Sequence, residues 1–185
     1  MNLEEIYADY QELGLGGKNG TSPNFVPGNG PCPAKIMIIG EAPGSEEDRT
    51  RKPFQGPSGQ ILDRLLGFAN IKREDVFVTN VFKYRPPRNR DPFSSEIVAS
   101  LPCLSAEIKC VNPAVIILAG KVACRSVFPA GRVGKLRGRV IPKGERFIVC
   151  TYHPGVLLWM NSKSIESSLK ADFLLAVEKA REVSD

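Results

Sequence analysis

The chain has 185 residues, of which 42% are hydrophobic, and a formal net charge of +5, so it is neither largely disordered nor too short for a substantial core. It has no apolar run near the length of a membrane span, and its acidic start, MNLEEIYADY, does not resemble a signal peptide. We therefore expect a single cytoplasmic domain over residues 1–185, in which residues 1–33 wrap around the body.

Strands and helices are predicted to alternate along the chain. Continuous apolar runs predict buried strands over residues 34–40, 76–84, 114–120 and 146–155. Apolar residues at helical spacing predict helices over residues 58–71, 94–110, 121–128 and 162–183. Pro102 should kink or divide the second of these helices. Residues 134–144, GKLRGRVIPKG, are interpreted as a ribbon or a loop.

This alternation predicts an α/β fold with three layers, α/β/α, around a central four-stranded parallel sheet. In such folds ligands bind beyond the carboxyl ends of the strands. The acidic loop GEAPGSEED follows the first strand, Asn80 lies in the outgoing half of the second, and His153 ends the fourth. We therefore expect these polar features to lie on one rim of the sheet.

The distribution of charged residues bears on the binding partner, and the cysteines bear on the cellular compartment. Basic residues cluster in KYRPPRNR and GKLRGR, which suit a nucleic acid but also an ordinary solvated surface. The cysteines include no CxxC pair, and the one histidine, His153, is not spaced from them as a zinc ligand. Scattered cysteines in a chain without a signal peptide indicate reduced thiols in a cytosolic protein. They lie at positions 32, 103, 110, 124 and 150.

A series of motifs resembles the family 4 uracil-DNA glycosylases. In order, these are GEAPGSEED…KPFQG, VTNVFKYRPPRNRDP, IILAGKVA, KLRG and TYHPGVLL, and their spacing matches from about Phe25 to the C-terminus. The resemblance implies a monofunctional DNA glycosylase that flips uracil out of DNA and hydrolyses its N-glycosidic bond, leaving an abasic site. It implies single- or double-stranded DNA as the partner, and we expect a monomer.

Two residues are implied to be catalytic, Glu41 and His153. Breaking the bond by a loose path leaves a cationic sugar and an anionic pyrimidine, and both charges need stabilisation in a dry pocket. The resemblance places Glu41 near the sugar, where its carboxylate orients a water. It places His153 at the pyrimidine O2, where a neutral imidazole donates a hydrogen bond. Without the resemblance, Glu41 is a surface acid or helix cap and His153 a structural side chain.

Five residues are implied to bind the base. The Asn80 amide can donate to O4 of uracil and accept from N3–H, whereas cytosine presents the opposite pattern. Phe54 would stack on the flipped ring, although it could equally be an ordinary core residue. Glu47 stands near C5, where a charged side chain would refuse the methyl group of thymine. The full set is Gly40, Ala42, Glu47, Phe54 and Asn80.

A DNA-binding surface is also implied. The GPSG segment offers helix N–H groups to a phosphate, KLRG supplies basic side chains, and an apolar side chain of the VLLW loop enters the minor groove. Family members usually carry Arg where this chain has Trp159. The identity of the wedge is therefore open, and Trp159 could also cover the core. The residues implied are Ser58, Gly59, Lys135, Arg137, Leu157, Leu158 and Trp159.

The clearest departure from the family concerns its cofactor. The family holds a 4Fe–4S cluster with four cysteines, two from an N-terminal CxxC, one from a KCRPP-like motif and one from the following helix. Here the N-terminal pair is missing, Tyr84 stands in KYRPP, and only Cys103 matches. One thiolate cannot hold the cluster, so we expect no iron–sulfur cluster and no other metal.

Three alternatives stay open. The substrate could be another damaged or C5-modified pyrimidine. The chain could be a catalytically weak DNA-binding relative, although the presence of Glu41, Asn80 and His153 together speaks against it. It could also hydrolyse free nucleosides or nucleotides, with the acids at 46–48 binding Mg²⁺, but then the basic ribbons and the apolar loop would have no purpose.

Overall fold

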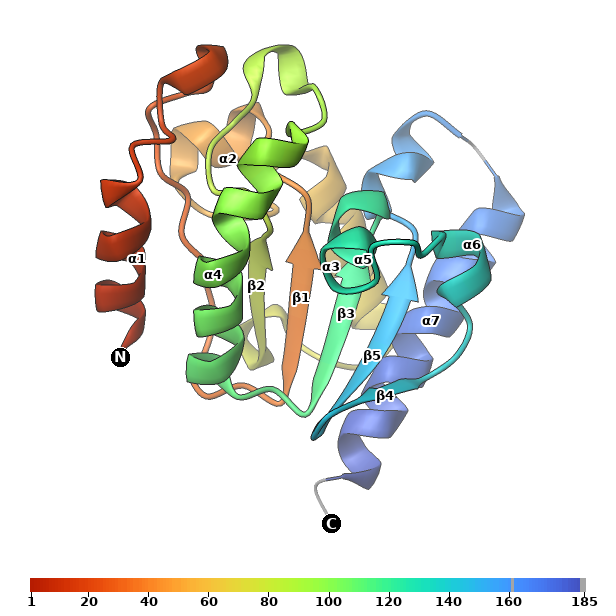
Figure 1. The fold of residues 1–185 in the computed structure, drawn as a ribbon. Coiled ribbons are helices and arrows are strands. Elements are labelled where there is room, and N and C mark those ends of the chain that lie inside the picture. Colours follow the sequence, from red (N-terminus) through yellow and green to blue (C-terminus); the bar gives the residue numbers. More distant parts are fainter. Residues whose placement is uncertain (161, 184–185) are drawn as a thin grey trace.

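A five-stranded sheet forms the middle layer of the fold. In the computed structural model, which describes residues 1–160 and 162–183, the strand order is β2-β1-β3-β5-β4 (Figure 1). The first four strands are parallel, and β4 pairs antiparallel with β5 at one edge. Their apolar runs are continuous because both faces of the sheet are covered. The strands are β1 (Ile36–Gly40), β2 (Val76–Asn80), β3 (Val115–Ala119), β4 (Ile141–Lys143) and β5 (Arg146–Thr151).

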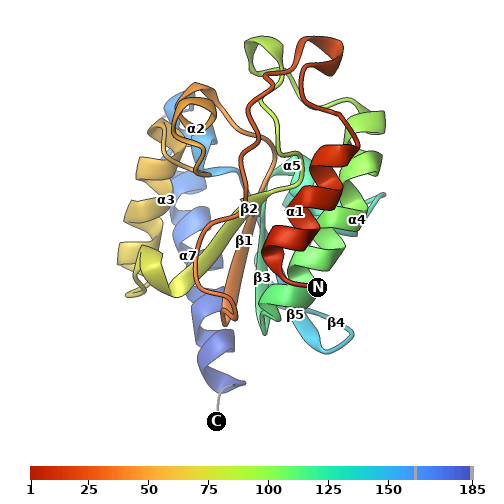
Figure 2. The ribbon, with the colours of Figure 1, turned by 90° about the vertical axis from the view of Figure 1, so that its left-hand side faces the viewer.

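Two helical layers cover the sheet (Figure 2). Helices α3 and α7 pack on one face around buried residues such as Leu62 and Phe173. Helices α4, α5 and α6 cover the other face, and α1 packs on α4. Among the residues that the structure describes, no helix is both long and apolar enough to cross a membrane. The α-helices are α1 (Leu3–Glu12), α2 (Ser45–Thr50), α3 (Pro57–Phe68), α4 (Ser94–Val111), α5 (Lys121–Val127), α6 (Val133–Leu136) and α7 (Lys163–Glu182).

Four single turns of 3₁₀-helix complete the connections. They are η1 (Lys18–Gly20), η2 (Arg73–Asp75), η3 (Pro87–Asn89) and η4 (Pro154–Leu158). The last of these follows β5 directly and carries the apolar loop VLLW. Its N-cap is His153, whose ring accepts a hydrogen bond from the amide of Gly155. A short turn therefore fixes both the histidine and the apolar loop at the same end of the sheet.

The predicted three-layer α/β fold with four parallel strands is confirmed, and three details differ. The segment expected to be a ribbon or loop contributes a fifth strand, β4, which the sequence hides because it is a short, exposed edge strand. The second and fourth strands end at Asn80 and Thr151 rather than at 84 and 155. Pro102 lies inside one continuous α4, since it removes only one backbone donor and packing on the sheet holds the rest.

Part of the N-terminal segment runs along the β2 edge of the sheet. The amide of Val26 donates to the carbonyl of Lys83 at 2.9 Å, and Asn29 forms an isolated antiparallel bridge with Val78. The segment thus supplies backbone hydrogen bonds to β2 and to the chain that follows it. An edge that would otherwise expose unpaired donors and acceptors is covered.

Candidate active site

The site lies beyond the carboxyl ends of the parallel strands, at the top of the sheet in Figure 1. A cleft of about 480 Å³ opens there, between the β1–α2 loop, the end of β2, the η3 loop and η4. Gly40 and Asn80 end neighbouring strands as register partners, so the loops that follow them start side by side. The cleft brings together many of the predicted site residues: Glu41, Ala42, Glu47, Phe54, Ser58, Asn80, His153, Leu158 and Trp159.

Gly40 lies under the cleft and makes room for two of its side chains. A Cβ atom at this position would lie 2.4 Å from Oδ1 of Asn80 and 2.6 Å from Cε2 of Phe54. Only a residue without a side chain lets both approach the strand end so closely. Asn80 is buried, and its amide makes no hydrogen bond to any residue that the structure describes. Its donor and acceptor are therefore available to a ligand.

Phe54 adopts a backbone conformation that aromatic residues rarely take. Its φ is 54°, in the left-handed region. The surroundings hold it there: Arg73 donates to the carbonyls of Pro53 and Phe54 at 2.8 and 3.5 Å. A Cβ on Gly59 would come within 1.9 Å of the Phe54 oxygen. Strain kept at a cleft by such contacts is typical of a residue with a binding role.

This packing corrects the expectation for Gly59. Gly59 was expected to offer its amide to a DNA phosphate, but that amide donates to the carbonyl of Gly56 at 2.8 Å. The amide of Gly56 is also engaged, since it donates to the Glu47 carboxylate at 2.8 Å. Gly59 serves instead to let the α3 N-terminus pass close to the Phe54 carbonyl. Ser58 is the member of this turn that lines the cleft.

The His153 ring is held as one tautomer of the neutral imidazole. Its Nδ1 accepts a hydrogen bond from the Gly155 amide at 3.1 Å, so the ring proton sits on Nε2. Burial lowers the pKa of His153 to about 4, although the Glu47 carboxylate by itself would raise that pKa. The Phe54 ring stacks beside it with centroids 5.6 Å apart. At neutral pH the site therefore presents an uncharged N–H donor.

Because His153 is the only histidine in the chain, its titration can be followed alone. In tag-free protein labelled with ¹⁵N, we expect imidazole shifts of a neutral ring protonated on Nε2, with a midpoint near pH 4. The folded pKa lies below the usual 6.5, so the unfolded chain takes up the proton first as the pH falls. Stability should then decrease as the pH falls from about 6.5 towards 4, an effect that His153→Gln should abolish. A midpoint near 6.5 would contradict this account.

Glu41 lies on the loop that leaves β1 and lines the same cleft. Burial raises the pKa of its carboxyl group to about 7, the Asp91 carboxylate raises it further, and Lys121 acts in the opposite direction. A group with this pKa is partly ionised at neutral pH and can act as an acceptor for water. Its backbone carbonyl accepts from the amide of Phe82 at 3.0 Å, which fixes the loop against the chain after β2.

Glu47, which was expected to stand near C5 of the pyrimidine, lines the cleft and also has a structural role. One carboxylate oxygen accepts from the amides of Gln55 and Gly56, both at 2.8 Å, and the other from the amide of Gly44 at 3.0 Å. Glu47 is buried and also lines the cleft. Its main effect is to tie the two loops of the wall together, so Glu47→Ala should disturb the whole wall and not simply widen the space at C5.

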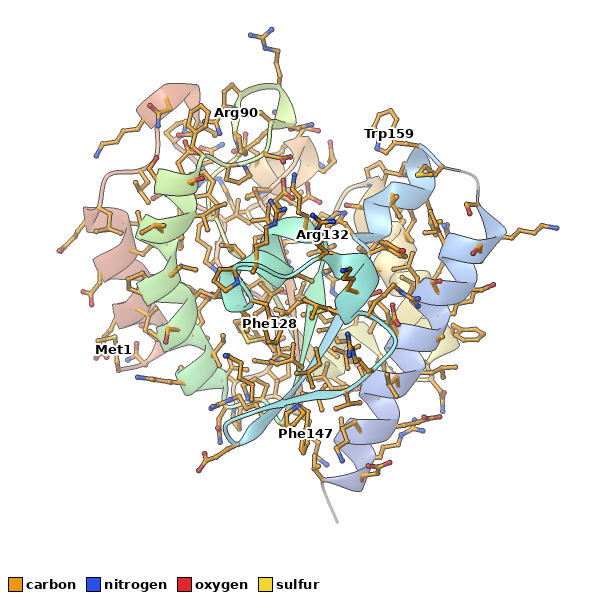
Figure 3. The ribbon with its side chains drawn as sticks, turned by 45° about the vertical axis from the view of Figure 1, so that its right-hand side comes forward. Met1, Arg90, Phe128, Arg132, Phe147 and Trp159 are labelled. Atoms are coloured by element: carbon orange, nitrogen blue, oxygen red, sulfur yellow. The ribbon has the colours of Figure 1, made fainter. Side chains whose placement is uncertain are left out.

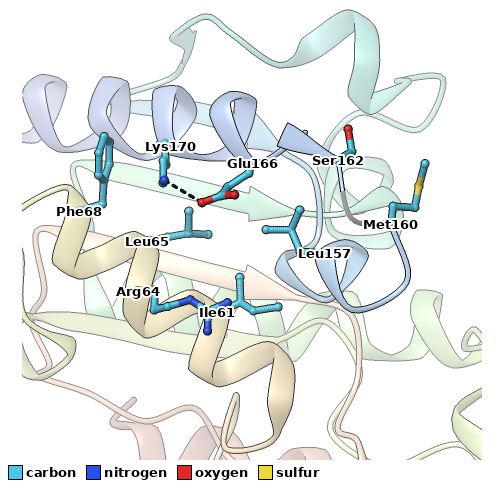
Figure 4. A pocket seen from close by; sticks show the side chains of 9 residues that line it. All are labelled: Ile61, Arg64, Leu65, Phe68, Leu157, Met160, Ser162, Glu166 and Lys170. Atoms are coloured by element: carbon cyan, nitrogen blue, oxygen red, sulfur yellow. Dashed lines mark ion pairs between the residues drawn. The ribbon is translucent and has the colours of Figure 1, made fainter. Parts of the chain in front are cut away.

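The apolar loop divides its side chains between two sides. Trp159 is 88% exposed and projects freely from the molecule (Figure 3), and Leu158 is 47% exposed beside it. Leu157 instead packs with Ile61 and Leu65 where α3 meets α7, in a second pocket of about 440 Å³ (Figure 4). This corrects the inclusion of Leu157 in the DNA-binding surface. Within VLLW, Leu158 and Trp159 are the two side chains that remain exposed.

The assignment of Arg137 to the DNA-binding surface also needs correction. Its guanidinium binds both carboxylate oxygens of Asp172 on α7 at 3.0 Å and also donates to the Ser168 carbonyl. Asp172 is fully buried and accepts from Thr151 as well. Arg137 therefore anchors the loop between α6 and β4, because it neutralises a buried carboxylate. Of the two basic residues in KLRG, only Lys135 is exposed.

Arg137 and Lys135 should differ in how much they contribute to the free energy of unfolding. Arg137→Met leaves Asp172 buried without its partner, and we expect the free energy of unfolding to fall by about 3–5 kcal/mol. Lys135→Met is the matched control and should change it by less than about 0.5 kcal/mol, since the side chain is exposed. Urea unfolding followed by circular dichroism measures both. Equal, small effects would mean that Arg137 does not hold the loop.

Some residues of the cleft were missed by the sequence analysis. Asn89 and Arg90 line it from the RPPRNRDP segment, in which the sequence analysis named no site residue. The positive φ of Asn89 and its neighbour Arg88 turns this loop back towards the cleft. Gly120, just before α5, was also not singled out. A Cβ atom on Gly120 would lie 3.0 Å from Cβ of His153, and the φ of Gly120 is +96°, so only glycine fits easily beside the histidine. The sequence signal that could have pointed to Asn89 is an asparagine in a proline-rich loop, because asparagine is common in turns.

The residues at the expected cluster position do not fit an iron–sulfur cluster. Tyr84 is buried and stacks with Tyr10 at a centroid distance of 5.9 Å, and Phe25 packs against both rings. Cys103 lies among these aromatic rings, and burial raises the pKa of its thiol to about 12. Within residues 1–160 and 162–183 no three His, Cys, Asp or Glu side chains form a group that could hold a metal. We call Tyr10, Phe25, Phe82 and Tyr84 the aromatic cluster.

Comparison with known proteins agrees with the motif series. Residues 27–180 match the family model described as the uracil DNA glycosylase superfamily. A type-4 uracil-DNA glycosylase of Saccharolobus solfataricus is 41% identical over 160 residues, which cover 81% of this chain and 73% of the relative. One of Thermotoga maritima is 39% identical over 162 residues, covering 85% and 82%. One of Pyrobaculum aerophilum is 38% identical over 144 residues, covering 73% and 74%.

Proposed function

The chain belongs to the uracil-DNA glycosylase superfamily, and on that premise we propose that it removes uracil from DNA by hydrolysing the bond between base and sugar. One observation carries the assignment of the site: Glu41, Asn80 and His153 face one cleft, with the ionisation and hydrogen-bonding states that this chemistry needs. A base inside a duplex cannot reach the cleft, so the nucleotide must be flipped out. The product is an abasic site.

His153 serves the leaving base in this proposal. As the bond to the sugar breaks, negative charge collects on the pyrimidine O2. The neutral ring with its proton on Nε2 donates a hydrogen bond to that oxygen and does not need to transfer the proton. Its pKa of about 4 suits this role, since an imidazole that stays neutral has one donor fixed in direction. Burial strengthens the interaction by excluding water.

Glu41 and Asn80 serve the sugar and the identity of the base. An ionised Glu41 favours the positive charge on the sugar and orients the attacking water. The amide of Asn80, which has no partner among the described residues, can donate to O4 and accept from N3–H of uracil. The reversed pattern of cytosine would leave both groups unpaired in a buried place, which disfavours that base strongly.

The test is excision of uracil in single turnover, on single-stranded and duplex oligonucleotides that carry one uracil. His153→Ala should lower the rate by about 10²–10³-fold, as for the loss of one oxyanion-type donor. Glu41→Ala should also slow the step, and neither change should greatly weaken DNA binding, because phosphate contacts dominate affinity. Glu74→Gln, an exposed substitution in η2 just before β2, is the control. Near-normal rates for both variants would refute the assignment.

The choice of base is tested in the same assay with a panel of pyrimidines. We expect alkali-labile sites from uracil and none from thymine or cytosine. If the wild type ignores uracil and releases a C5-substituted base, the roles of Glu41 and His153 stand and the proposed substrate is wrong. Failure to release any base, with DNA still bound, would identify a binding protein.

We also propose that the chain works without an iron–sulfur cluster. Its support is the aromatic cluster, which fills the position with stacked rings and leaves Cys103 as an isolated, un-ionised thiol. Protein purified without oxygen should be colourless and hold no stoichiometric iron, as measured by visible absorbance and iron analysis. Close to four iron atoms per chain would overturn this proposal while leaving the glycosylase assignment intact.

A further inference from the structure

Two cysteine side chains lie next to each other at the end of the sheet opposite the cleft. The sulfur atoms of Cys32, in the loop before β1, and Cys110, in the last turn of α4, are 3.5 Å apart. The Cys32 thiol also donates to the carbonyl of Cys110 at 3.4 Å. The two residues are 78 positions apart in the sequence, so folding alone brings them together. The loop before β1 and the end of α4 meet at the bottom of the view in Figure 1.

The backbone beside both cysteines is already held in place. The amide of Ala34 donates to the carbonyl of Val111 at 3.1 Å, and the amide of Ala114 donates to the carbonyl of Lys35 at 3.0 Å. The sulfur atoms of a disulfide are about 2.05 Å apart, so these two must approach by roughly 1.5 Å. Because Cys32 is exposed, rotation of its side chain can supply this movement while the backbone hydrogen bonds stay in place.

Access to solvent distinguishes this pair from the other cysteines. Cys32 is exposed and Cys110 is partly exposed, whereas the other three cysteines are buried. An oxidant dissolved in water therefore meets the pair first. Partial burial and the hydrogen bond with Cys110 raise the pKa of the Cys32 thiol, and the thiolate is the form that reacts. The pair should therefore react faster in mildly alkaline solution than at neutral pH.

We propose that Cys32 and Cys110 are an oxidation site, at which the folded chain forms an intramolecular disulfide when it meets a low-molecular-weight disulfide such as oxidised glutathione. The Cys32 thiolate attacks one sulfur of the oxidant, which forms a mixed disulfide and releases one glutathione thiolate. The Cys110 thiolate then attacks the Cys32 sulfur and releases the second glutathione thiolate. Two protein thiols are oxidised and one glutathione disulfide is reduced, and the two released thiolates take up the protons that the cysteines lose.

The disulfide would tie the loop before β1 to the end of α4. It would close a loop of chain that contains β1, α2, α3, β2 and most of α4, and would thereby restrict the unfolded state more than the folded one. We expect the oxidised protein to melt about 5–15 °C above the reduced protein. This proposal does not depend on the activity of the cleft, which lies at the other end of β1.

The experiment uses the full chain, reduced, freed of reductant and incubated while folded with oxidised glutathione at about pH 8.5. Remaining thiols are blocked with N-ethylmaleimide during unfolding, and the protein is digested without reduction and analysed by mass spectrometry. We expect the peptides of Cys32 and Cys110 to be joined, with no glutathione retained. The other three cysteines, Cys103, Cys124 and Cys150, should carry the maleimide, because they are buried during the incubation.

Two matched variants separate the steps of the reaction. Cys110→Ser should stop at the mixed disulfide, with glutathione retained on Cys32. Neither Cys110→Ser nor Cys32→Ser should gain thermal stability on treatment, as measured by differential scanning calorimetry. Glutathione that persists on Cys32 of the wild type, a disulfide found only between two chains, or an unchanged melting temperature of the oxidised wild type would each overturn the proposal.

Discussion

A fully buried ion pair between Lys83 and Glu107 holds the end of β2 on which the site is built. The Lys83 ammonium lies 2.6 Å from the Glu107 carboxylate, and neither side chain is accessible to solvent. Lys83 also donates to the hydroxyl of Thr79 and to the carbonyl of Asn80, at 2.8 Å in the second case. Removing both charges from water is costly, and either one alone would be strongly destabilising. The ion pair therefore fixes the position of the peptide group of Asn80.

The same ion pair joins the N-terminal segment to the site. The Tyr7 hydroxyl donates to Glu107 at 2.6 Å and accepts from the Gly28 amide at 3.0 Å. The network joins α1, α4, β2, the chain that follows β2 and the loop before β1. The adjoining aromatic cluster adds apolar burial to the same junction. Together they hold α1 and the KYRPP turn against α4 by packing and hydrogen bonds.

Burial has opposite consequences for the two ionisable residues that face the cleft. It disfavours the charged form of each group, so it raises the pKa of Glu41 and lowers that of His153. The pair then spans neutral pH with a carboxyl group that can ionise and an imidazole that stays neutral. One physical cause, exclusion of water from the end of the sheet, thus gives the cleft an ionisable carboxyl group and a neutral imidazole donor. In the proposed reaction the first serves the sugar and the second the pyrimidine.

The sequence by itself determined the layers of the fold and the meeting of Glu41, Asn80 and His153, because apolar runs mark parallel strands and the carboxyl ends of such strands share one edge. It could not determine what each polar side chain would contact. Glu47 binds amides of its own loop wall, and Arg137 binds Asp172, which lies 35 residues further along the chain. The proton position on His153 is set locally, by the turn that brings the Gly155 amide to Nδ1, and its side-chain conformation is visible only in the folded structure. The types and spacing of residues show which positions along a helix or strand are buried. They do not show which group will pair with a buried donor or acceptor, because that partner often comes from a distant segment that packing brings within hydrogen-bonding distance.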